Sequence, residues 1–267
     1  MAVAARLVVV ALILALTSPV SALDWKGYEG SARGFPALRD LDGRKLADGD
    51  FLQWIEGGRL HVRITYTTRG GTIEERAVFR QRPELVQERW SLRERRNGAV
   101  YREFAIDFPA RVATAMKRDE GSPKTWREEI DVTAGRAFAG FGFTLALRAV
   151  RTRLLRGEHV ALQTVGFTPG PRTVDVDVSF AGTDRIRMAG RSIQGERFVV
   201  HPKVPWFAKL FVNAPDAQIW LTTPAPPGFL RFEGPLAEPG EPAIRVDLLP
   251  GGGPSEAATP VATSGRR

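Results

Sequence analysis

Apolar and polar residues alternate along most of this sequence, and this period of two constrains the fold more than any other feature. From residue 60 to residue 67, Leu, Val, Ile and Tyr alternate with His, Arg and Thr. Residues 173–180 and 243–248 repeat the pattern. Such alternation is typical of strands with one buried face. Because the connections are too short for crossover helices, antiparallel pairing is favoured.

One segment departs from this pattern and indicates a helix. Residues 140–155 carry two apolar stripes, one with Phe143 and Leu147 and the other, nearly opposite, with Phe141 and Leu145. Apolar stripes on two sides require burial on two sides. We therefore predict a mainly β fold. It is a single antiparallel, strongly curved sheet or barrel-like sandwich of about ten strands, with one buried central helix.

The turn signals predict the register of the first hairpins. A two-residue loop at Arg69-Gly70 pairs Tyr66 with Ile73 and keeps the apolar residues on one face. A turn at Arg82-Pro83 then pairs Ile73 with Leu92.

At the next turn, a two-residue loop would mix the two faces of the strands. A three-residue loop ending in a left-handed Gly98 restores the apolar face, with Trp90 opposite Phe104 and Arg102 opposite Leu92.

This register places charged side chains on an apolar face, where they must be paired or lie near water. Arg102 is then diagonal to Glu94, within reach of a long side chain. Glu75 and Glu88 lie on the same face. Three interpretations stay open: a structural ion pair near the rim of the sheet, polar groups that orient a ligand in a cavity, or paired carboxylates that hydrolyse a substrate.

The N-terminal 22 residues have the features of a cleaved signal peptide. Arg6 is followed by the apolar run 7–16, and Val20-Ser21-Ala22 has the small residues of a cleavage site. Cleavage after Ala22 would start the mature protein at Leu23. The apolar run is too short to span a membrane, which takes about 20 residues.

These observations predict three segments: a signal peptide (1–22), a single β-rich domain (23–250) and a disordered C-terminal tail (251–267). The tail consists mostly of Gly, Pro, Ser, Ala and Thr, which bury little surface. The expected location is periplasmic or secreted.

The composition excludes several classes of function. The sequence has no Cys, which excludes disulfides, thiol catalysis and a lipoprotein anchor. Its three His have no metal-ligand spacing, and no nucleotide or hydrolase fingerprint occurs, so we expect no metal and no cofactor. The net charge of +8 attracts anions, but the basic residues are dispersed and export removes the protein from nucleic acids, so no nucleic-acid partner is expected.

The layout resembles that of exported bacterial proteins with a DUF3108-type domain of unknown function. The shared features are a signal peptide, meandering strands, a central apolar helix ending in Leu-Arg (141–148) and an Ile-Trp-Leu strand (219–221). A more distant similarity is to the periplasmic lipoprotein carriers, whose half-barrel is closed by helices. The first resemblance implies no activity, and the second implies binding of an apolar ligand. Neither assigns a functional residue.

Two functions therefore remain. The first is non-enzymatic binding of an apolar or amphipathic ligand, such as a lipid, or of an envelope partner. The second is hydrolysis of an envelope polymer through the carboxylate cluster. The candidate ligand-binding residues are Glu75, Glu88, Trp90, Arg102 and Leu147.

Overall fold

The structure is a computed structural model, and its described residues are 23, 25, 27–118, 122–188, 190–203, 215–223 and 226–248. The predicted signal peptide and C-terminal tail lie outside them. No helix in the described part has the length and apolarity needed to cross a membrane.

Strands dominate the described residues. In chain order they are β1 (Ala32–Gly34), β2 (Ala37–Asp40), β3 (Lys45–Glu56), β4 (Arg59–Thr68), β5 (Gly71–Arg80), β6 (Val86–Arg96), β7 (Ala99–Asp107), β8 (Val112–Lys117), β9 (Lys124–Glu129), β10 (Val160–Phe167), β11 (Pro171–Met188), β12 (Arg191–Pro202), β13 (Ala217–Thr222), β14 (Phe229–Gly234) and β15 (Ile244–Asp247). The helix α1 (Gly142–Leu155) stands between β9 and β10.

The strands form one antiparallel sheet in the order β10-β11-β12-β13-β14-β15-β2-β3-β4-β5-β6-β7-β8-β9, with β1 paired to β3. Within the described residues, the predicted mainly β fold with a single antiparallel sheet and one helix is confirmed. The sheet has 15 strands rather than about ten. Short strands such as β1, and the charged edge strand β9, carry too little apolar alternation to be recognised from sequence.

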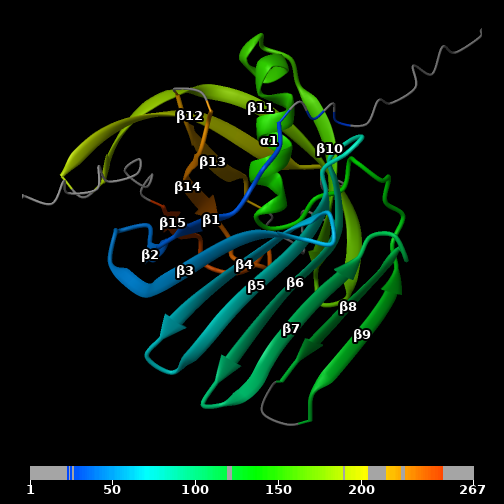
Figure 1. Cartoon of the computed structure of the whole chain (residues 1–267). Helices are drawn as coiled ribbons and strands as arrows, with labels where there is room; N and C mark the ends of the chain where they lie inside the picture. The colour runs from blue at the N-terminus through cyan, green and yellow to red at the C-terminus, as the bar shows by residue number, and fades with distance from the viewer. Residues whose placement is uncertain are drawn as a thin grey trace, which may run out of the picture.

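The two ends of the sheet approach each other. Near one end, β11 contacts β8 and β9, which lie at the other end of the strand order. Gly170, before β11, lies against the indole of Trp126 on β9. No described backbone pairing joins β9 to β10, so the sheet is not closed. Figure 1 shows α1 next to β10 and β11, with β3–β9 spread beyond its N-terminal end.

The first hairpin register is confirmed. Tyr66 pairs with Ile73 across the β4–β5 turn, and the apolar residues share one face. The next register is wrong by two residues, because Ile73 pairs with Glu94 instead of Leu92. The β5–β6 turn pairs Arg80 with Val86, which shifts the register by one residue. A bulge beside Phe79 shifts it by one residue more.

The predicted register of β6 and β7 is also wrong. The loop has two residues, Asn97 and Gly98, both with positive φ (48° and 80°), as a type I′ turn requires. A bulge between Glu94 and Arg95 returns the apolar residues of β6 and β7 to the same face of the sheet. Arg102 therefore lies directly opposite Glu94.

The helix is buried on both sides, as its stripes predict. Leu145, Ala146 and Leu147 are each 0% exposed, although consecutive residues point in different directions around a helix. The helix begins at Gly142 rather than at residue 140, because Gly140 has a φ of +53° and forms the turn before it. Its buried apolar residues belong to the main hydrophobic core together with residues of the sheet.

Candidate functional site

An apolar cavity of about 240 Å³ lies between the sheet and the N-terminal end of α1. Its walls come from β3–β5, from β10–β15 and from the turn before the helix. Phe51, Phe141 and Phe229 form an aromatic wall, with ring centroids 5.2 and 6.2 Å apart. This volume exceeds the roughly 150 Å³ of an engineered cavity that holds benzene.

One carboxylate lines this apolar cavity. Glu75, on β5, is the only acidic or basic residue among the described residues of the lining. Its Oε1 accepts hydrogen bonds from the backbone N–H of Phe141 (2.7 Å) and from the indole N–H of Trp90 (2.9 Å). The carboxylate thus meets the N-terminal end of the helix, where the dipole favours negative charge.

Burial raises the pKa of Glu75, and the hydrogen bonds from Phe141 and Trp90 oppose this rise without cancelling it. Tyr66 lies on the neighbouring strand and also lines the cavity. Burial raises the pKa of its hydroxyl, and the nearby charge of Glu75 raises it further. The cavity therefore places a hydroxyl donor and a carboxylate acceptor side by side in apolar surroundings.

Two glycines let the helix approach the sheet this closely. A Cβ at Gly140 would collide with the carboxylate of Glu75 and the indole of Trp90, and a Cβ at Gly142 would collide with Gln87. Gln87 exchanges hydrogen bonds with the backbone of Ala139, donating at 3.2 Å and accepting at 2.8 Å. The Gly-Phe-Gly segment is therefore a docking turn that fixes Phe141 in the cavity wall.

Gly140→Ala is expected to destabilise the protein more than a comparable glycine substitution elsewhere. Gly57 has nearly the same φ (+55°), but open space surrounds it. Gly57→Ala should cost only the backbone strain, about 1–2 kcal/mol. Gly140→Ala should cost about 1–3 kcal/mol more, because it also forces Glu75 aside. Urea denaturation of both variants checks this, and equal costs would show that the close approach is not required.

The segment between β14 and β15 contributes another part of the cavity wall. Pro235, Leu236, Ala237 and Pro239 all line the cavity. The same segment carries Glu238 and Glu241, and these connect it to β7 and β8. We call residues 235–241 the rim segment.

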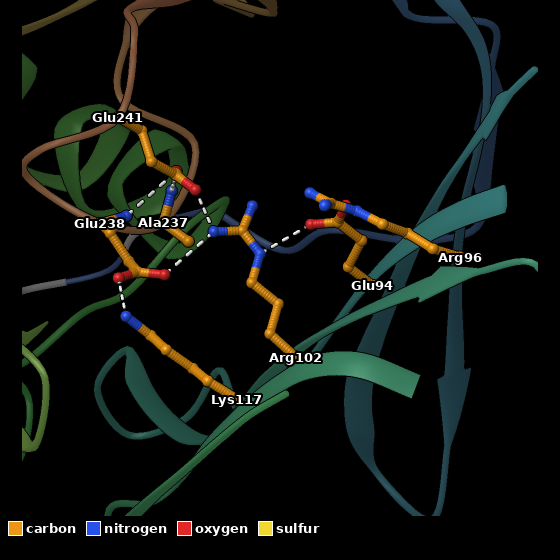
Figure 2. Close-up of polar contacts among 7 residues, drawn as sticks. All are labelled: Glu94, Arg96, Arg102, Lys117, Ala237, Glu238 and Glu241. Atoms are coloured by element: carbon orange, nitrogen blue, oxygen red, sulfur yellow. Dashed lines mark hydrogen bonds and ion pairs between the residues drawn. The ribbon is translucent and has the colours of Figure 1, made fainter. Parts of the chain in front are cut away.

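A network of ion pairs fastens the rim segment to the sheet, with Arg102 at its centre (Figure 2). Arg102 Nε donates to Glu94 Oε2 at 2.7 Å, and its Nη1 donates to Glu238 Oε1 at 3.0 Å and to Glu241 Oε1. Lys117 completes the network by pairing with Glu238. Glu241 Oε2 also accepts from the backbone N–H of Ala237 at 3.0 Å, closing the turn.

Comparisons with known proteins give little further information. No protein-family model and no curated protein matches the chain. Among solved structures, the chain is similar to the hypothetical lipoprotein YmcC from Escherichia coli K12, with a TM-score of 0.37 and 12% identity over 82% of this chain and 85% of that chain. Similarity at this level supports no argument about fold or function.

The structure separates the five residues singled out from the sequence. Only Glu75 lines the cavity, and Trp90 supports it through a hydrogen bond. Leu147 is fully buried but is not among the lining residues. Arg102 belongs to the ion network, and Glu88 pairs with Arg59 at 2.8 Å, away from Glu75. Glu88 is separated because the bulge in β5–β6 leaves it without a cross-strand partner.

Sequence reasoning missed Tyr66 as a polar residue of the site, and it missed the role of the Gly-Phe-Gly turn. Tyr66 continues an apolar stripe, so alternation alone marks it as core. The sequence signal for the turn was the pair of glycines on either side of Phe141, at the start of the helix. The described residues contain no group of three or more His, Asp or Glu placed to hold a metal.

Proposed function

We propose that this is an exported, non-enzymatic protein that binds a small apolar or amphipathic ligand in the cavity beneath α1. The observation that carries the proposal is the composition of the lining. Apolar side chains from many strands face the cavity, and the polar groups among them are few: Tyr66, Glu75, Thr144 and Thr164. Ligand sites are typically largely apolar with a few placed polar groups.

The size of the cavity limits the ligand. At about 240 Å³ it is smaller than the roughly 300–1,000 Å³ of sites for drug-sized molecules. A single alkyl chain or a small ring compound fits this range better than a whole two-chain lipid. A strongly curved sheet that wraps α1 would supply such a site, and the contacts of β11 with β8 and β9 support this curvature.

The alternative, hydrolysis through a carboxylate cluster, has weaker support. Of the carboxylates predicted to act together, Glu94 is bonded to Arg102 and Glu88 to Arg59. Neither is among the described residues of the cavity lining, where Glu75 is the only carboxylate. Carboxylates held in ion pairs with a guanidinium are poorly placed to exchange protons with a substrate.

The proposal is tested by native mass spectrometry of the protein purified from the periplasm of an expressing bacterium without detergent. We expect an adduct that corresponds to one bound small amphiphile per chain. Adduct-free protein from several preparations, which also fails to take up added decanol, would contradict the proposal.

Val176→Phe should abolish ligand uptake while leaving the fold intact. Val176 lies on β11 and lines the cavity, so the added ring has empty space to enter. Val178→Phe is the matched control, since this residue is two positions along the same strand, 0% exposed, and outside the lining. It should cost about 1–3 kcal/mol through overpacking but should retain the adduct in the folded fraction. Equal ligand loading in both variants would place the ligand elsewhere.

A further inference from the structure

The polar pair in the cavity has unused hydrogen-bonding capacity. Both hydrogen bonds to Glu75 fall on Oε1, from Phe141 and Trp90, and no described residue donates to Oε2. The hydroxyl of Tyr66 also has no hydrogen-bond partner among the described residues, and both residues line the cavity. Polar atoms that line an apolar cavity without a protein partner are free to bond a ligand or a water molecule.

The two groups are positioned to be satisfied by one ligand head group. Glu75 pairs with Ile64, so it is diagonal to Tyr66 on the same face of the sheet. Diagonal neighbours on adjacent strands are about 7–8 Å apart at Cα, and long side chains span this distance. The carboxylate can accept one hydrogen bond at Oε2, and the phenol can donate one.

We propose that the cavity selects a single-chain amphiphile whose head group donates a hydrogen bond and carries no negative charge, such as a long-chain alcohol or primary amine. This inference rests on the proposed function and specifies its ligand. The head group lies at Glu75 and Tyr66, and the chain runs along the aromatic wall of Phe51, Phe141 and Phe229.

The charge of the site supports this selection. No Lys or Arg is among the described residues of the lining, so an anionic head group would find no counter-charge in this part of the wall. It would also lie beside the carboxyl group of Glu75, and the burial that disfavours the charge of this group would disfavour a second negative charge next to it. Arg102 cannot compensate, because its guanidinium is occupied by Glu94, Glu238 and Glu241.

Isothermal titration calorimetry of the full chain, freed of lipid by refolding, tests the selection with three probes of equal chain length: decanol, decylamine and decanoate at pH 7. We expect decanol and decylamine to bind at least 10-fold more tightly than decanoate. Glu75→Gln keeps an oxygen that can accept from Phe141 and Trp90 but removes the charge. This variant should weaken decylamine binding at least 10-fold and narrow the difference between decanol and decanoate.

Tyr66→Phe should weaken binding of decanol severalfold through loss of the phenol donor, without changing the order of the probes. Glu74→Gln is the control, because Glu74 lies on the same strand but pairs with Arg76 on the outer face, 2.8 Å away. It should leave all three affinities unchanged.

The outcomes separate the inference from the proposed function. If the three probes bind equally well, or if decanoate binds best, the head-group selection is wrong while ligand binding stands. If water rather than a ligand satisfies the polar pair, Glu75→Gln and Tyr66→Phe will leave the affinities unchanged, and this also overturns the selection. If none of the probes binds the wild-type chain, both proposals fail.

Discussion

Leu145→Asp and Leu147→Asp should each lower the free energy of unfolding by at least about 4 kcal/mol, at the severe end of single substitutions. Each side chain is 0% exposed and belongs to the main core. The substitution removes a large apolar contact and buries a carboxylate without a partner. A helix that lay on a sheet with its back in water would tolerate one of the two.

Thermal and urea unfolding of both variants measures this effect, with Thr152→Asp as the control. Thr152 is exposed on the same helix, so its substitution tests the effect of a negative charge near the helix C-terminus alone. That effect is expected to be about 0.3–1 kcal/mol. Near wild-type stability of either Leu variant would reject burial of the helix on two sides.

Arg102→Met should also destabilise the protein strongly and lower the free energy of unfolding by about 3–5 kcal/mol. The side chain of Arg102 is 9% exposed, and its removal leaves three carboxylates whose remaining partners among the described cations are Lys117 and Arg96. Burial favours the neutral form of Arg102, but the charges and hydrogen bonds of Glu241 and Glu94 raise its pKa above the ordinary value. The guanidinium is therefore charged at neutral pH.

Arg96→Met provides a matched comparison. Arg96 bonds the same Glu94 at 2.6 Å, but its side chain is 54% exposed, so its loss should cost less than about 1 kcal/mol. Arg102→Met should also release the rim segment, which hydrogen–deuterium exchange would detect as faster exchange at Ala237 and Glu238. Unchanged exchange there, or equal losses of stability in the two variants, would contradict a fastening role for Arg102.

Alternation and turn residues were sufficient to predict the coarse fold. The β4–β5 register followed because a two-residue loop leaves Tyr66 and Ile73 on one face. The later registers failed at bulges beside Phe79 and Glu94, which insert one residue without any composition signal of their own. The prediction still placed Arg102 within reach of Glu94, because a register error of two residues leaves every side chain on its predicted face of the sheet.

The site was harder to predict because it joins distant segments. Alternation placed Glu75 on the inner face, but nothing local indicates that its partner is the backbone of Phe141, 66 residues away. The rim segment meets Arg102 across an even longer separation, 136 residues to Glu238. Such contacts depend on how the whole sheet brings its ends together, and no local pattern encodes that.

The central claim is that a ligand occupies the cavity beneath α1. The most direct measurement is a crystal structure of the protein with 10-bromodecanol, in which anomalous scattering locates the bromine. The account predicts one bromine site within the cavity, with the alcohol oxygen at Glu75 and Tyr66, and no such site in crystals of the Val176→Phe variant. Bromine found only on the outer surface of the sheet, with the cavity empty of ligand, would contradict it.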